Sequence, residues 1–126
     1  MDLRTPLSKV RGLGSAKDGT EHFWMQRLTA IANIPLVIFL VVVIVSNVGA
    51  SHAEVAANLG APLVTVGLLL AVLSITWHMR LGMQVIIEDY VPAEGTKIVC
   101  LLANTFFCAG VAVTAGFAIL KLGFGA

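Results

Sequence analysis

Charged residues are scarce in this sequence: Asp, Glu, Lys and Arg make up 12% of its 126 residues, whereas hydrophobic residues make up 58%. A soluble domain usually carries about 25% charged residues. So short a chain forms one domain at most, and it could not bury this much apolar surface in a water-soluble core. The shortage of charge therefore excludes an ordinary soluble domain and indicates an integral membrane protein.

Cysteine is scarce as well, and the formal net charge is only +1. Cys100 and Cys108 lie in an apolar stretch, at a spacing that suits neither a zinc site nor a redox pair. Two cysteines cannot hold an iron–sulfur cluster, which needs four ligands. We expect both to be small packing residues. Because the net charge provides no strong field, no nucleic-acid partner is expected.

Three apolar stretches are each long enough to cross a bilayer, because about 20 helical residues span about 30 Å of hydrocarbon. We predict helices over residues 23–48, 61–88 and 96–122. Pro35 lies inside the first helix and is tolerable in lipid. Residues 49–60 are predicted to be a short polar connector, and Pro92 and Gly95 break the chain again. The predicted fold is all-α, with a three-helix transmembrane anchor over residues 23–126.

Lysine and arginine are concentrated at the start of the chain. Five of the eight lie in the first 27 residues: Arg4, Lys9, Arg11, Lys17 and Arg27. The side richer in Lys and Arg is normally cytoplasmic. We therefore predict that residues 1–22 form an irregular or partly amphipathic cytoplasmic segment, that the 49–60 connector lies outside, and that the C-terminus is periplasmic. The expected location is a bacterial inner membrane; in a mitochondrion, the inner side would be the matrix.

The most informative residue is His78, an ionisable side chain inside the second predicted helix. It lies eleven positions before Asp89, which is roughly 16 Å from the inner end of that helix. Ionisable groups at such depth usually face protein, water or a cofactor. Small residues share its stripe of the helix and would let another backbone or a flat ligand approach closely. These residues are Gly67, Ala71, Ser74 and Gly82.

Two interpretations of His78 follow from its depth and its neighbours. It is either an axial ligand of a haem iron or a hydrogen-bonding partner of another helix. Spacing alone leaves both open. His22 and His52 lie at or beyond the membrane surface. A haem with two histidine ligands would therefore need a partner subunit.

Two arginines lie near or within the predicted helices. Arg27 opens the first helix at the inner boundary, where it is a positive-inside anchor, and its forked guanidinium also suits a haem propionate or a quinone. Arg80 points about 200° around the helix from His78. We expect Arg80 to pair with a carboxylate or a lipid phosphate, and a propionate is the less favoured partner.

Glu88, Asp89 and Tyr90 cluster at the inner end of the second predicted helix. They form either a solvated helix end or a polar pocket at the membrane edge. In the second case Tyr90 would donate a hydrogen bond to a carbonyl, and Asp89 would orient it or relay a proton. The sequence does not separate these interpretations.

The run His78-Met79-Arg80-Leu81-Gly82-Met83, followed by Asp89-Tyr90-Val91, resembles the signature of the D-type membrane anchor of succinate dehydrogenase, respiratory complex II. In that family a histidine is followed by Gly-Met four and five residues on, and by Asp-Tyr-Val eleven to thirteen residues on. The run Arg27-Leu28-Thr29-Ala30 looks like the family's Arg-x-Thr-Ala. The resemblance extends from about Phe23 to the C-terminus.

This resemblance implies that His78 is an axial ligand of haem b, whose other ligand is a histidine of a C-type cytochrome b anchor subunit. It implies that Tyr90 hydrogen-bonds ubiquinone, the substrate, beside Asp89, and that Arg27 lies near the haem propionates. The chain would pack with that second three-helix anchor and dock the flavoprotein and iron–sulfur subunits. It would perform no succinate chemistry itself, as a non-catalytic subunit of a quinone-reducing enzyme.

Two alternatives remain at this point. One is the anchor of a quinol:fumarate reductase, because the direction of reaction depends on the quinone's potential and on the partner subunits. The other is a small non-redox membrane protein in which His78 hydrogen-bonds to a neighbouring helix.

Overall fold

The computed structural model describes residues 5–12 and 18–125, and within them it contains helices and no strands. Two helices are short and three are long. In chain order they are α1 (Pro6–Arg11), α2 (Asp18–Ser46), α3 (His52–Leu59), α4 (Pro62–Tyr90) and α5 (Glu94–Gly123).

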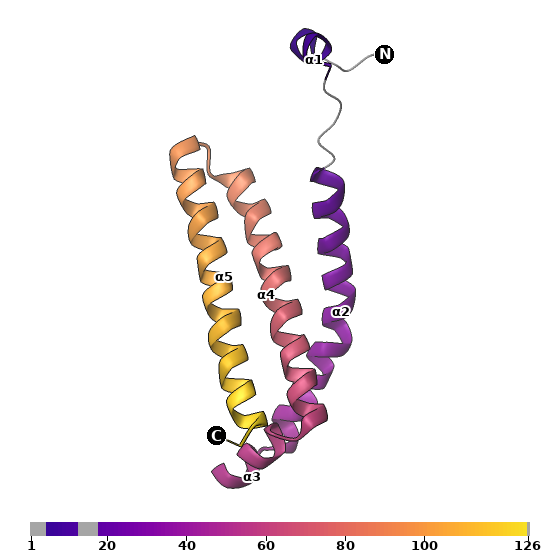
Figure 1. Cartoon of the computed structure of the whole chain (residues 1–126), viewed down its shortest axis with the longest axis vertical. Helices are drawn as coiled ribbons and strands as arrows, with labels where there is room; N and C mark the ends of the chain where they lie inside the picture. Colours follow the sequence, from indigo (N-terminus) through magenta and orange to yellow (C-terminus); the bar gives the residue numbers. More distant parts are fainter. Residues whose placement is uncertain (1–4, 13–17, 126) are drawn as a thin grey trace.

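The three long helices confirm the predicted all-α fold with three candidate membrane spans. The apolar part of α2 has 28 residues, and α4 and α5 have 29 and 30, so each is long and apolar enough to cross a bilayer. They lie side by side, with α4 in the middle (Figure 1). Within the described residues, α4 packs against both neighbours and α2 makes no direct contact with α5.

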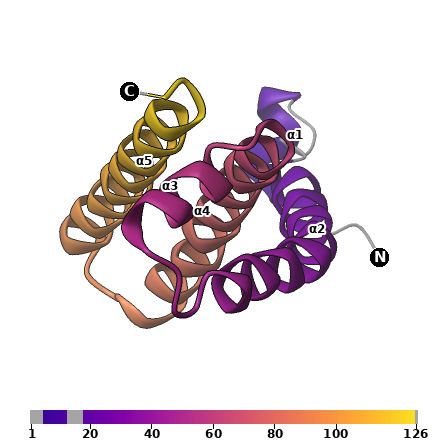
Figure 2. The same cartoon turned by 90° about the horizontal axis from the view of Figure 1, so that it is seen from below.

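The helix ends sort into two groups at opposite ends of the bundle. The start of α2, the end of α4 and the start of α5 lie at one end, and α1 lies beyond it (Figure 1). At the other end α3 crosses beneath the bundle near the C-terminus (Figure 2), in contact with α4 and α5. The chain therefore runs from one end of the bundle to the other three times in succession, in α2, α4 and α5.

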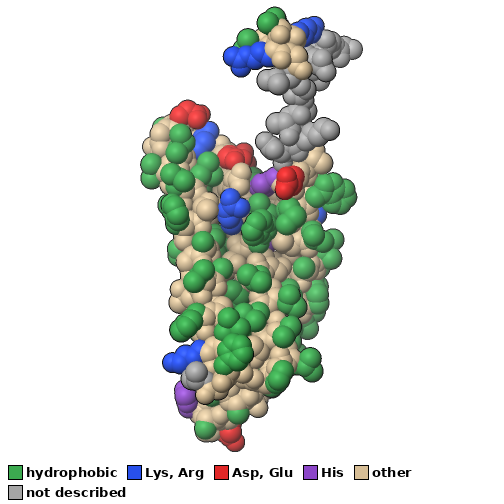
Figure 3. Space-filling model, in the orientation of Figure 1, with side chains coloured by type: hydrophobic (Ala, Val, Ile, Leu, Met, Phe, Trp, Pro, Cys, Tyr) green, Lys and Arg blue, Asp and Glu red, His purple; other side chains and the backbone are tan. Residues whose placement is uncertain are grey.

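The surface of the bundle is apolar between its two ends. Phe106 is 73% exposed and Phe117 is 69% exposed, both on α5. On the face drawn in Figure 3, charged side chains gather toward the two ends and hydrophobic side chains cover much of the region between them. Such a surface fits lipid or another membrane helix. The buried residues lie chiefly on α4, including Ala71, Leu81 and Ile87, because α4 has a neighbour on each side.

Two segments predicted outside the membrane spans contain more helix than expected. The connector predicted at 49–60 contains α3, because Ser51 and Glu54 form a capping box: the Ser51 backbone N–H donates to Glu54 Oε2 at 2.7 Å, and the Glu54 N–H donates to Ser51 Oγ at 3.4 Å. The segment predicted to be irregular or partly amphipathic up to residue 22 contains α1 and the first turns of α2. Arg4 and Lys17, on which the predicted orientation partly depends, lie outside the described residues.

Candidate functional site

His78 is half-buried on α4 and makes one hydrogen-bond contact, to the neighbouring helix. Its Nδ1 lies 3.0 Å from Oγ1 of Thr29 on α2. Its Nε2 has no hydrogen-bond partner in the described part of the chain. Among the described side chains, Nε2 of His22 is the one buried polar atom that lacks a hydrogen-bond partner. The unbonded Nε2 of His78 is therefore not fully buried and remains accessible. One edge of the imidazole is therefore bound to protein, and the other is open to a ligand.

The stripe of small residues on α4 packs mostly against α2. A Cβ added at Gly67 would lie 2.6 Å from the tip of the Phe39 ring. Ser74 Oγ donates a hydrogen bond of 2.7 Å to Asn33 Oδ1, and Ala71, between them on the stripe, is fully buried. The sequence allowed either another backbone or a flat ligand beside this stripe. In the structure a neighbouring helix, α2, covers most of it.

The space beside Gly82 is different. This glycine lies one helical turn beyond His78 on the same stripe, and a Cβ added there would meet nothing within 4 Å. A flat ligand bound to His78 therefore has room toward the end of α4 that carries Tyr90, and not toward Gly67.

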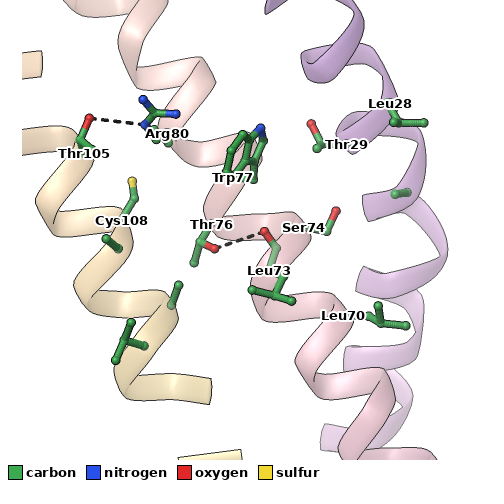
Figure 4. A pocket seen from close by; sticks show the side chains of 14 residues that line it. Leu28, Thr29, Leu70, Leu73, Ser74, Thr76, Trp77, Arg80, Thr105 and Cys108 are labelled. Atoms are coloured by element: carbon green, nitrogen blue, oxygen red, sulfur yellow. Dashed lines mark hydrogen bonds between the residues drawn. The ribbon is translucent and has the colours of Figure 1, made fainter. Parts of the chain in front are cut away.

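A groove of about 740 Å³ runs over α4 between α2 and α5, and His78 does not line it. Its polar residues include Arg80, whose Nε donates a hydrogen bond of 3.4 Å to Thr105 Oγ1 on α5 (Figure 4). The guanidinium also lies 5.7 Å from the centre of the Trp77 ring. No carboxylate of the described residues pairs with Arg80, so the expected carboxylate pairing does not occur within the described part of this chain. Arg80 does point to a different neighbour from His78, as predicted.

Tyr90, Asp89 and Glu88 form an exposed end of α4. Tyr90 is 79% exposed, and its hydroxyl makes no hydrogen bond to the described residues. Asp89 is exposed and does not hydrogen-bond to Tyr90, whereas Glu88 Oε1 accepts a bond of 2.8 Å from Gln84. Tyr90 lies twelve positions after His78, about 18 Å further along the helix axis. The structure therefore separates the two predicted sites.

Arg27 is exposed on α2, two positions before Thr29. Its guanidinium carbon lies 5.3 Å from the centre of the Phe23 ring. No carboxylate of the described residues pairs with it. The arginine is thus available to an anionic group from outside the chain, close to the level of His78.

The described residues contain no group of three or more His, Cys, Asp and Glu side chains that could hold a metal ion. Cys108 is buried and contacts Asn104 Oδ1 at 3.5 Å, and Cys100 is half-buried. His78 can therefore serve as a metal ligand only where the other donors come from elsewhere, as they do in a porphyrin with a partner subunit.

Sequence reasoning missed two residues of this site. Thr29 and Asn33 lie four positions apart on α2, and they meet His78 and Ser74, which lie four positions apart on α4. Residues at this spacing share one face of a helix. Two matching pairs of polar residues in otherwise apolar spans were a signal of facing helices.

Comparison of the sequence with known proteins shows the family of this chain. The family model described as succinate dehydrogenase/fumarate reductase transmembrane subunit matches residues 1–112. The chain belongs to this family. The match begins at residue 1, so the resemblance is not confined to the part after Phe23. No solved structure matches the chain.

Several curated relatives of this family member have names of the same kind. The succinate dehydrogenase hydrophobic membrane anchor subunit of Rickettsia bellii (strain RML369-C) is 32% identical over 106 residues, which cover 84% of this chain and 85% of the relative. The subunit of the same name from Paracoccus denitrificans is 30% identical over 122 residues, covering 97% and 94%. The succinate dehydrogenase membrane anchor subunit of Reclinomonas americana is 35% identical over 88 residues, covering 68% and 73%.

Proposed function

We propose that this chain anchors a succinate dehydrogenase in the membrane and binds haem b through Nε2 of His78. The observation that carries the proposal is the state of the imidazole: Nδ1 contacts Thr29 at 3.0 Å, and Nε2 is without a partner among the described residues. An axial ligand needs one free ring nitrogen held in a defined direction. The open space beside Gly82 fits the edge of a porphyrin.

The haem is expected to lie between this chain and a partner. His22 is at the start of α2, and His52 is exposed on α3 at the opposite end of the bundle. Neither lies at the level of His78, so a second histidine ligand would come from the C-type cytochrome b anchor. Arg27, near the level of His78, suits a propionate because a guanidinium fork matches a carboxylate. Bound haem b would take up and release single electrons at its iron.

The exposed end of α4 suits a quinone. The hydroxyl of Tyr90 is free to donate a hydrogen bond to a ubiquinone carbonyl, and Asp89 next to it supplies a carboxylate for proton exchange. Because Tyr90 is not bonded within the chain, it can form this bond without losing another one. The partner subunits would complete and cover the pocket.

The orientation is supported by the charge at the two ends of the bundle. Lys9, Arg11 and Lys97 belong to the end that carries Tyr90, whereas Lys121 lies near the other. By the positive-inside rule the Tyr90 end faces the cytoplasm. The flavoprotein and iron–sulfur subunits would dock at that end of a bacterial inner membrane, and electrons from succinate would reach the quinone there.

The direction of the reaction is proposed from the relatives. The family description covers both succinate dehydrogenases and fumarate reductases, but the relatives compared above are named as succinate dehydrogenase anchors. We therefore favour succinate oxidation with ubiquinone reduction over the reverse reaction.

The test of the haem proposal is optical. His78→Gln in the assembled complex is expected to change or abolish the reduced-minus-oxidised b-haem spectrum, because an amide does not replace the imidazole nitrogen. His22→Gln and His52→Gln are the matched controls and should leave the spectrum unchanged. An unchanged spectrum in His78→Gln would overturn the ligand assignment, and a colourless wild-type protein that copurifies with no flavoprotein would favour the non-redox alternative.

A further inference from the structure

The hydroxyl of Thr29 takes part in three polar contacts inside the membrane span. Its Oγ1 lies 2.8 Å from the Met25 carbonyl oxygen, 3.2 Å from the Gln26 carbonyl oxygen and 3.0 Å from His78 Nδ1. Thr29 is 8% exposed and projects from α2 toward α4 (Figure 4). These contacts leave little freedom for the position of its single hydroxyl proton.

The proton count decides the direction of the bond to His78. Both carbonyl oxygens can only accept, and an unprotonated Nδ1 would be a third acceptor for the one hydroxyl proton of Thr29. Donation to Nδ1 would leave the 2.8 Å contact with the Met25 carbonyl oxygen without a proton, so all three contacts are favourable together only when the hydroxyl donates within its own helix. The lone pairs of Oγ1 then face Nδ1, and a contact of 3.0 Å is favourable only if Nδ1 carries a proton. In a neutral imidazole the second nitrogen, Nε2, must then have a free lone pair.

We propose that Thr29 is the positioning residue of the haem ligand: it holds His78 in the tautomer protonated on Nδ1, so that Nε2 is unprotonated and directed away from α2. This inference rests on the proposed haem function and deepens it. The hydrogen bond joins residues 49 positions apart on two helices, so it also fixes the ring plane relative to both. No water inside the bilayer replaces a lost partner of Nδ1.

The hydrogen bond has a second, electronic consequence. A ligating histidine that donates its other N–H to an acceptor becomes more basic toward the metal. A more basic ligand favours the ferric over the ferrous state, so Thr29 should lower the midpoint potential of the haem. Removing the acceptor should raise the potential, even where the haem remains bound.

The variant that tests this is Thr29→Val, which keeps the shape of the side chain and removes the oxygen. The matched control is Thr76→Val. Thr76 is 7% exposed on α4 and donates to its own helix, to the Val72 carbonyl at 2.6 Å, but makes no hydrogen bond to His78. Both variants remove one buried hydroxyl from a membrane helix. Thr29→Ser restores the oxygen, and Thr29→Ala replaces Thr29→Val if the valine variant does not assemble.

The measurements are the haem-to-flavin ratio and the midpoint potential of the b haem in the purified complex. Thr29→Val is expected to weaken haem retention by about tenfold or more. It is also expected to raise the potential, and a tenfold change in the preference for ferric iron corresponds to about 59 mV for one electron. Thr29→Ser should stay close to wild type, and so should Thr76→Val.

Each result separates this inference from the proposed function. If His78→Gln loses the haem signal while Thr29→Val keeps the wild-type ratio and potential, the ligand assignment stands and the role of Thr29 is wrong. Equal shifts in Thr29→Val and Thr76→Val would also overturn it, since the effect would then come from any lost hydroxyl. If neither His78→Gln nor Thr29→Val changes the spectrum or the potential, both the haem proposal and the role of Thr29 are overturned.

Discussion

Tyr90→Phe is the sharpest perturbation of the proposed quinone site, because it removes one oxygen from a side chain that has no internal partner. Tyr90 is 79% exposed at the end of α4, and its hydroxyl makes no hydrogen bond within the described residues. The substitution should therefore leave the stability of the chain within about 0.5 kcal/mol of wild type. Any functional loss then reports a bond to a molecule outside this chain.

The expected size follows from the single bond removed. A neutral hydrogen bond contributes about 0.5–1.5 kcal/mol, which corresponds to about a two- to thirteenfold lower kcat/KM for ubiquinone reduction. The assay compares two activities of the same purified complex: succinate oxidation with a quinone acceptor, and succinate oxidation with an artificial acceptor that takes electrons from the soluble subunits. The first should fall and the second should be unchanged.

Two results would refute this reasoning. An equal loss of both activities would show that the substitution disturbs docking or assembly and not the quinone. An unchanged kcat/KM for ubiquinone would show that the Tyr90 hydroxyl does not contact it. Asp89→Asn serves as the companion variant: it keeps the shape of the neighbouring side chain, and its effect should depend on pH if the carboxylate exchanges protons with the quinone.

Two further predictions concern the end of the bundle opposite to Tyr90. A Cβ added at Gly60 would lie 2.7 Å from the Leu122 backbone oxygen, so Gly60→Ala should destabilise the chain by about 1–3 kcal/mol. Gly110→Ala is the control and should not destabilise the chain, because a Cβ added there meets nothing within 4 Å. Equal unfolding midpoints of the two variants in detergent would contradict the fold at this end. The hydrogen bond from the Ser51 side chain is the main cause of the lowered pKa of Glu54, which lies below the ordinary 4.5. The stabilisation of α3 by the ionised Glu54 carboxylate is therefore complete above pH 4.5 and is lost as the pH falls through the lowered pKa. Ser51→Ala should reduce the protection of the α3 amides from hydrogen exchange already at neutral pH. Protection equal to wild type at that pH would count against the cap.

The sequence by itself determined the membrane-spanning character of this protein. Three apolar stretches longer than a bilayer is thick can satisfy their backbone hydrogen bonds in lipid only as helices, so the number of long helices followed from composition and length. The depth of His78 followed in the same way, from its distance to the charged end of its helix. The run from His78 to Met83, followed by Asp89-Tyr90-Val91, resembles the signature of the family, and the family model confirmed this resemblance.

The sequence was less informative about the connector after the first membrane helix and about the partners of side chains on the helix faces. The polar composition of residues 49–60 suggested a connector, although the capping box of Ser51 and Glu54 stabilises a helix there. Arg80 was expected to pair with a carboxylate or a lipid phosphate, and within the described residues it contacts Thr105 and Trp77 and no carboxylate. Its neighbours come from another helix or from its own helix face, and their identity depends on how the helices pack.

The tertiary structure alone decided what each helix face meets. A helix that is apolar on all sides has no preferred orientation in lipid, so periodicity places Gly67, Ser74 and His78 on one stripe but does not say what covers it. Packing supplies the answer: Phe39 fills the space at Gly67, Asn33 binds Ser74, and Thr29 binds His78. The choice between a helix contact and a haem ligand was open in the sequence because both need a buried histidine. The folded chain shows why the two are compatible, since the contact uses Nδ1 and leaves Nε2 free.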